Sequence, residues 1–124
     1  MAVLIAAAML LVGQVADDQV EDAPIETVEV QDAAPLSPHA YLYATYPSLA
    51  RRLDCMIQGE SSWLPWARSG PYLGLAQFDY PTWLETPQGR AGRARTDPYA
   101  AIDAMAWGVR NLGYGRWPVT SRRC

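Results

Sequence analysis

The chain has 124 residues and a formal net charge of −3, and its charges are unevenly distributed. Residues 1–40 contain seven acidic groups and no Lys or Arg, whereas residues 41–124 contain ten Arg and six acidic groups. One histidine and two cysteines leave no His/Cys cluster for a metal, so we expect neither a metal nor a cofactor. A basic domain behind an acidic leader suits an anionic polymer such as cell wall or nucleic acid, and a solvated Arg surface is the alternative.

Residues 1–16, MAVLIAAAMLLVGQVA, form an apolar run that ends on a small residue, Ala16. The run is short for a membrane span and is typical of the core of a secretory signal peptide, although no Lys or Arg precedes it. We therefore expect a secreted or extracytoplasmic protein, in the cell wall or periplasm, with no stable membrane insertion after signal cleavage. An uncleaved anchor is the alternative.

Residues 17–40 hold seven acids and three prolines, and they offer little apolar surface to bury. Such a segment cannot offset its ordering entropy, so we predict a disordered acidic linker. Val28 and Val30 alternate with acids, which leaves a short strand as the alternative. His39, the only histidine, falls in this linker and is expected to be solvated.

Residues 41–124 carry the fold, which we predict to be one small, mostly α domain with short irregular or β elements. Ser48 is the expected cap of its first helix, and one stripe of that helix is apolar. The stripe comprises Leu49, Leu53, Met56 and Ile57. At 3.6 residues per turn the same stripe reaches Glu60, where desolvation would raise the carboxyl pKa and keep the group protonated near neutral pH. Fraying of the helix before Gly59 would instead leave Glu60 exposed.

The next segments are shorter. Prolines keep residues 61–73 irregular, and residues 74–78 are expected to form a tight turn into a short helix or strand. Asp79 is predicted to cap a helix that turns Trp83 inward. Its competing role, positioning a water molecule in a hydrolase, is the weaker interpretation. Residues 86–96 are predicted to be a Gly- and Arg-rich surface loop.

The clearest helix of the sequence begins after Asp97, which is the expected cap, with Pro98 at the first helical position. Gly113 is expected to end the helix. Its predicted buried side comprises Ile102, Met105, Ala106, Val109 and Leu112.

Only two cysteines are present, Cys55 and the final residue, Cys124. In an exported chain an even number of cysteines predicts a disulfide. This bond would close a loop of about 70 residues and contribute about 4 kcal/mol to stability in the chain-entropy model. Two independent buried thiols are the alternative.

Residues 60–77, ESSWLPWARSGPYLGLAQ, resemble a signature of the lysozyme-like superfamily, E-S-x-x-x-P-x-A-x-S followed by G-L-x-Q. The resemblance is closest to soluble lytic transglycosylases and goose-type lysozymes. Asp97, Pro98 and Ile102 resemble the D-P-x-x-N-I helix start of that family. The C-terminal half resembles the resuscitation-promoting factor branch, in which a Cys near the catalytic Glu pairs with one near the C-terminus.

The resemblance implies a glycosidase that cleaves the β-1,4 bond between N-acetylmuramic acid and N-acetylglucosamine in peptidoglycan, with Glu60 as the single catalytic residue. Because no second carboxylate is evident, we expect a lytic transglycosylase, with a hydrolytic muramidase as the alternative. The resemblance implies substrate contacts by Gln77, Ser61 and Ser69. Two aromatic residues that flank the expected cleft, Tyr72 and Trp63, are candidates for stacking on sugars. Trp83 and Trp117 are assigned to packing.

The sequence departs from the family pattern at three positions. Ala76 replaces a frequent Met, Ala101 replaces the Asn after D-P, and Gly108 stands where a Tyr is expected. A non-catalytic cell-wall-binding module on the same fold is therefore a further alternative.

The expected partner is the peptidoglycan glycan strand, bound by a monomer. The arginines of the 86–96 loop lack an aromatic platform, so we expect a solvated loop and no nucleic-acid partner.

Overall fold

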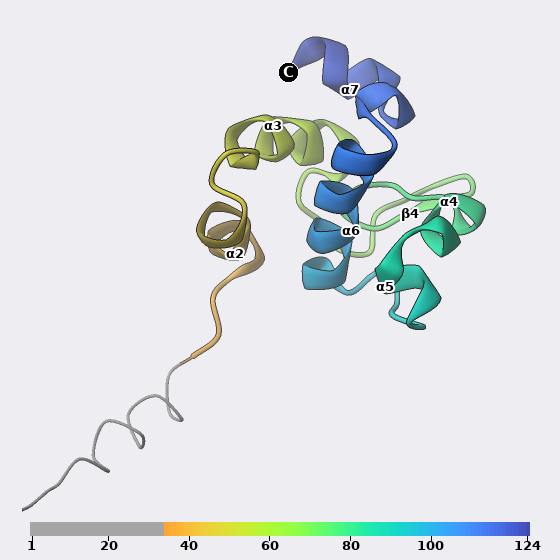
Figure 1. The fold of residues 1–124 in the computed structure, drawn as a ribbon, viewed down its shortest axis with the longest axis horizontal. Coiled ribbons are helices and arrows are strands. Elements are labelled where there is room, and N and C mark those ends of the chain that lie inside the picture. The colour runs from red at the N-terminus through yellow and green to blue at the C-terminus, as the bar shows by residue number, and fades with distance from the viewer. Residues whose placement is uncertain (1–33) are drawn as a thin grey trace, which may run out of the picture. The chain divides into compact units, whose positions relative to one another are not determined.

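The computed structural model describes residues 34–124, which form helices, one 3₁₀ helix and a two-stranded hairpin (Figure 1). The predicted mostly α fold with short β elements is confirmed. The predicted signal peptide, residues 1–16, and residues 17–33 of the predicted linker lie outside the described residues. In chain order the elements are α2 (Pro38–Thr45), α3 (Ala50–Ser61), β3 (Arg68–Ser69), β4 (Tyr72–Leu73), α4 (Tyr80–Glu85), α5 (Pro87–Arg90), α6 (Pro98–Asn111), the 3₁₀ helix η2 (Tyr114–Arg116) and α7 (Pro118–Arg123).

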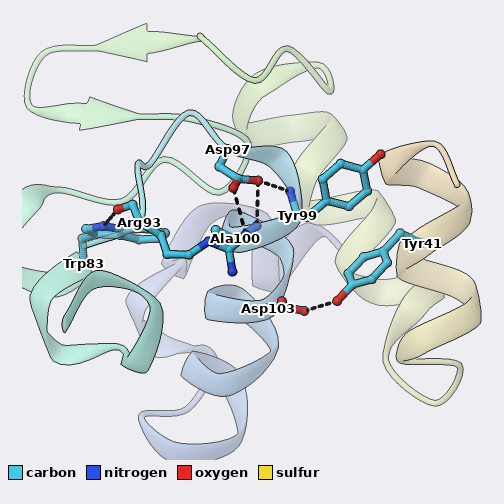
Figure 2. Close-up of polar contacts among 7 residues, drawn as sticks. All are labelled: Tyr41, Trp83, Arg93, Asp97, Tyr99, Ala100 and Asp103. Atoms are coloured by element: carbon cyan, nitrogen blue, oxygen red, sulfur yellow. Dashed lines mark hydrogen bonds and ion pairs between the residues drawn. The ribbon is translucent and has the colours of Figure 1, made fainter. Parts of the chain in front are cut away.

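Helix α6 forms the centre of the core, and α2 and α5 pack against it (Figure 1). Its buried residues are Ala100, Ala101, Ile102, Ala104, Met105, Ala106, Gly108 and Val109. As predicted, Asp97 caps the helix, and its carboxylate accepts hydrogen bonds from the N–H groups of Tyr99 and Ala100 at 3.0 and 3.2 Å (Figure 2). Small side chains dominate the buried face, so neighbouring elements can approach the α6 backbone closely.

Helix α2 lies partly within the predicted linker. It begins at Pro38, and the Ser37 hydroxyl caps it by accepting a hydrogen bond from the N–H of Ala40 at 3.1 Å. The folded unit therefore begins at Leu36 rather than at residue 41. His39 belongs to this helix rather than to the linker, but it is exposed, as expected. Its Nε2 lies 2.9 Å from an Asp54 carboxylate oxygen on α3.

Long-range contacts hold α2 on the core. Leu42 is fully buried, and the hydroxyls of Tyr41 and Tyr46 donate to the same Asp103 oxygen on α6 at 2.8 and 2.6 Å. Figure 2 shows the first of these hydrogen bonds, between α2 and α6. Burial, together with the Asp103 carboxylate, raises the pKa of Tyr46, so its phenol remains a donor at neutral pH.

Helix α3 follows the predicted apolar stripe and extends through Glu60, as the periodicity indicates. Leu53, Met56 and Ile57 are fully buried. The predicted Ser48 cap is wrong. The chain leaves α2 through a tight turn in which the Leu49 N–H donates to the Tyr46 carbonyl at 3.0 Å, so Leu49 takes the cap position without a side-chain hydrogen bond.

Trp83, in the short helix α4, is 1% exposed, and the short helix α5 packs against α4. The predicted Asp79 cap is confirmed, since its carboxylate accepts a hydrogen bond from the Thr82 N–H at 2.9 Å. The loop predicted for residues 86–96 instead begins with α5. Thr86 caps this single turn by accepting a hydrogen bond from the Gly89 N–H at 3.0 Å. The Gly89 backbone lies directly against Trp83, where its N–H group needs a partner within the protein.

The predicted disulfide is confirmed. Cys55 on α3 is bonded to Cys124, which directly follows α7, and the two residues are 69 positions apart in the sequence. A disulfide of this kind is compatible with an oxidising, extracytoplasmic compartment. Within residues 34–124, every helix is too short or too polar to cross a membrane.

Candidate active site

A groove of about 370 Å³ opens beside the last turn of α3. It brings together residues from α3, the β3–β4 hairpin, the loop after β4, η2 and α7. Its lining residues are Gly59, Glu60, Ser69, Tyr72, Gln77, Arg116, Trp117, Pro118 and Val119. Four of the residues that the sequence singled out, Glu60, Ser69, Tyr72 and Gln77, therefore share one concave surface.

A second space of about 240 Å³, the extension, lies beside the groove. The two share four lining residues, Tyr72, Gln77, Arg116 and Trp117, so they are adjacent. The extension is further lined by Phe78, Asp79, Thr82 and Gly115.

Glu60 is half-buried in the last turn of α3. One of its carboxyl oxygens, Oε2, accepts a hydrogen bond from the Thr120 hydroxyl on α7 at 2.8 Å. Acidic side chains are disfavoured at the C-terminal end of a helix, where the macrodipole is negative, and no basic residue in this last turn compensates. A residue that breaks a local preference in this way is more often found at a functional site than elsewhere.

Gln77 lines the same groove as Glu60 from a tight loop. Its backbone is left-handed, with φ +53°, and its side chain is 8% exposed. The side-chain Nε2 donates to the carbonyls of Ala67 and Gly74, both at 2.9 Å. Because both amide protons are engaged within the loop, only the Oε1 carbonyl can bind a ligand, and it would accept from a hydroxyl or amide.

The hairpin supplies one wall of the groove. Ser69 on β3 pairs with Tyr72 on β4, and both lie in the groove lining. Tyr72 is 45% exposed, so its ring is accessible at the groove wall. A flat ring at a groove wall can lie against the C–H face of a sugar.

Two of the predicted substrate contacts lie elsewhere. Ser61 is buried, and its hydroxyl donates to the Ile57 carbonyl one turn back at 3.1 Å. Trp63 donates its indole N–H to Asp54 at 2.9 Å, and its ring lies 4.8 Å from that of His39. Trp63 lines a different pocket of about 440 Å³, because the chain turns away from α3 through two left-handed residues, Ser62 and Trp63.

Glu60 is the single acidic residue among those lining its groove within residues 34–124. Asp79 lies in the extension and is engaged as the α4 cap. The hydrogen bonds from the Thr82 hydroxyl and N–H lower the pKa of Asp79, so it remains a carboxylate and a cap.

The groove also contains residues that the sequence did not single out for it. Arg116 lines both the groove and the extension, and it pairs with Glu85 at 3.3 Å. Trp117, assigned to packing, is indeed 4% exposed and donates to the Ala76 carbonyl at 2.8 Å, but it also lines the groove. Thr120 carried no local signal at all, because only the folding of α7 against α3 brings it to Glu60.

The departure at Gly108 has a structural counterpart. A side chain there would meet the Trp117 ring, since a Cβ atom would come within 2.9 Å of its Cη2 atom. The space that a larger residue at 108 would need is thus occupied by Trp117. Ala101 is 1% exposed on the same helix and belongs to the core.

Comparison of the chain with known protein families, with curated proteins and with solved structures finds no match.

Proposed function

We propose that the chain is a peptidoglycan-cleaving glycosidase, a lytic transglycosylase that acts on the β-1,4 bond between N-acetylmuramic acid and N-acetylglucosamine. The observation that carries this proposal is the shared groove of Glu60 and Gln77, residues that come from two separate parts of the lysozyme-like signature. Independent motif positions that meet at one concave surface favour a common ligand.

In the proposed reaction, Glu60 first acts as a general acid. It transfers its proton to the glycosidic oxygen, and the electrons of the breaking C1–O bond go to that oxygen. The resulting carboxylate then takes a proton from the 6-hydroxyl of the muramic acid, whose oxygen attacks C1. The product is a 1,6-anhydro sugar, and no water is consumed.

The absence of a second acid from the Glu60 groove, within the described part of the chain, favours this route over hydrolysis. A hydrolase with two carboxylates needs a nucleophile or a base on the far side of the sugar, at a separation of roughly 5–10 Å. Internal attack by the 6-hydroxyl needs only one residue that gives and takes a proton.

The remaining lining residues suit a glycan. Tyr72 offers aromatic surface, Gln77 offers a carbonyl oxygen for a sugar hydroxyl or acetamido N–H, and Ser69 offers a hydroxyl. The Arg116 guanidinium offers positive charge to a lactyl or peptide carboxylate of the polymer. The confirmed disulfide fits secretion into the wall or periplasm, where this substrate lies.

The test is Glu60→Gln, assayed on purified peptidoglycan with mass spectrometry of the released fragments. The wild-type chain should release muramic acid ends lighter by one water than hydrolytic ends. The variant should bind peptidoglycan but lower turnover at least about a hundredfold, the usual contribution of a general acid. Muramic acid ends that carry the full mass of a hydrolysis product would show that the chain is a muramidase instead.

A non-catalytic wall-binding module is the second candidate. It is favoured by Gly108, where the resemblance implies a Tyr but Trp117 occupies the room that a larger side chain would need. Such a module would bind peptidoglycan, would release no fragments, and would tolerate Glu60→Gln without loss of binding.

A further inference from the structure

Thr120 is a buried polar residue in direct contact with Glu60. It is 3% exposed, and its hydroxyl donates to Glu60 Oε2 at 2.8 Å. Valine has nearly the same shape and no hydroxyl to satisfy, so packing alone does not account for a threonine here. The buried hydroxyl needs a partner, and the partner is the proposed catalytic carboxyl group.

Gly59 allows this contact to form. A Cβ atom at position 59 would come within 2.8 Å of Thr120 Cγ2, closer than carbon atoms pack. Glycine weakens the interior of a helix, so its presence in α3 directly before Glu60 has a cost. The close approach of α7 to α3 at this point explains why position 59 is a glycine.

Two further contacts hold α7 in register on α3. The Arg52 guanidinium donates to the Ser121 carbonyl at 3.1 Å, and Cys55 is bonded to Cys124. Cys55 precedes Gly59 by one helical turn, and Cys124 follows Thr120 by one turn, so the two helices run antiparallel. The hydroxyl therefore reaches Glu60 from an element that is covalently tied to the helix carrying Glu60.

We infer that Thr120 is a positioning residue for Glu60, acting by donating to Oε2 so that Oε1 is the oxygen that carries the proton and faces the substrate. This inference rests on the proposed function. An acid whose two oxygens have different partners cannot exchange its proton freely between them. After proton transfer, the same hydrogen bond stabilises the carboxylate that must then act as the base.

The experiment compares Thr120→Val, which removes only the hydroxyl, with Thr120→Ser, which keeps it. Thr120→Val should lower kcat about tenfold, corresponding to about 1.4 kcal/mol, with KM on solubilised glycan changed less than about twofold. Thr120→Ser should restore most of kcat. The alkaline side of the pH–rate profile should move to higher pH in Thr120→Val only, because the ionised form loses its donor. Thr96→Val, at an exposed threonine, is the matched control and should change nothing.

A Thr120→Val variant with wild-type kcat and pH profile would overturn the inference. If the wild-type chain cleaves no glycan, the proposed function fails. Contact between the Thr120 hydroxyl and Glu60 is then measured by carbon-13 NMR of the Glu60 carboxyl group. That resonance should then shift at neutral pH in Thr120→Val but not in Thr96→Val. An unchanged resonance would show that the hydroxyl does not act on Glu60.

Discussion

Among single residues, Gly74 sets the loop that presents Gln77 to the groove. Its φ is +93°, and a Cβ atom there would lie 2.2 Å from the Arg95 carbonyl oxygen. Its own carbonyl accepts one of the two Gln77 amide hydrogen bonds, and its N–H donates to Ala67 at 2.8 Å. The position thus needs glycine for two reasons, a left-handed backbone and a close neighbouring backbone.

Gly74→Ala should therefore destabilise the chain more than positive φ alone explains. The left-handed backbone costs an L-residue about 1–2 kcal/mol, and the clash with a backbone carbonyl that cannot swing away adds about 1–3 kcal/mol. Urea unfolding followed by tryptophan fluorescence measures the difference in free energy of unfolding.

Gly92→Ala separates the two causes. Gly92 has φ +80°, but nothing lies within 4 Å of its Cβ position. The Gly92→Ala variant should therefore lose only the free energy that the left-handed backbone costs, about 1–2 kcal/mol. Equal losses for Gly92→Ala and Gly74→Ala would contradict the close approach of the Arg95 carbonyl.

Among the elements, α6 is anchored at its start by a carboxylate with three partners. Asp97 accepts from two backbone N–H groups, and Arg93 pairs with its other oxygen at 2.8 Å. Burial alone would raise the pKa of Asp97, but the Arg93 hydrogen bond and the N–H groups of Ala100 and Tyr99 outweigh it and lower that pKa below its ordinary value of 3.8. The helix start is thus stabilised specifically by the ionised form.

Removing this cap should cost stability in a pH-dependent way. Asp97→Ala should lower the free energy of unfolding by about 1–2 kcal/mol near neutral pH, the usual worth of an N-cap. A lowered native pKa means that the contribution of the charge is complete above about pH 5 and is lost as the pH falls through the native pKa. Chemical unfolding at a series of pH values between 7 and 3 measures both effects.

Asp97→Asn is the control that keeps a capping oxygen and removes the charge. Its deficit relative to the wild-type chain should shrink as the pH falls below the ordinary value of 3.8. A deficit that stays constant down to the acid end would mean that the Arg93 pairing does not stabilise the native state.

For the molecule as a whole, the joining of α3 to α7 decides whether the groove exists. One wall of the groove comes from α3 and another from η2 and α7, which follow the last long helix of the chain. Within residues 34–124, Cys55–Cys124 is the one covalent link between these walls. The folded unit spans only Leu36–Cys124, a size at which a single core gives limited stability.

The double variant Cys55→Ser, Cys124→Ser should therefore lose about 4 kcal/mol of unfolding free energy, because the unfolded chain gains the freedom of an open loop. Both cysteines are exposed, so the serines leave no buried polar group unpaired. Equilibrium urea unfolding measures the loss, and the reduced wild-type chain should match the variant. A loss below about 1 kcal/mol would show that packing of α7 alone maintains the groove.

Features that depend on neighbours in the sequence were predictable. Asp79 and Asp97 each precede a proline near a helix start, and both caps form as predicted because an N-cap bond joins residues only two or three positions apart. The apolar stripe of α3 likewise requires only helical spacing, and it carries Glu60 to the groove. Glu60 and Gln77 were found through a motif whose positions lie close together in the chain.

Features that depend on distant partners were decided by the tertiary structure alone. Helix α2 is held by tyrosines that reach Asp103, 57 and 62 residues away, and its own sequence carries little periodic apolar signal. Ser61 and Trp63 were expected near the substrate, but Ser61 is buried and bonded to its own helix, and the left-handed backbone at residues 62 and 63 turns Trp63 elsewhere. Thr120 reaches Glu60 across 60 residues. Local rules describe how a segment folds, whereas a groove is made where segments meet, and only the packed core determines which ones do.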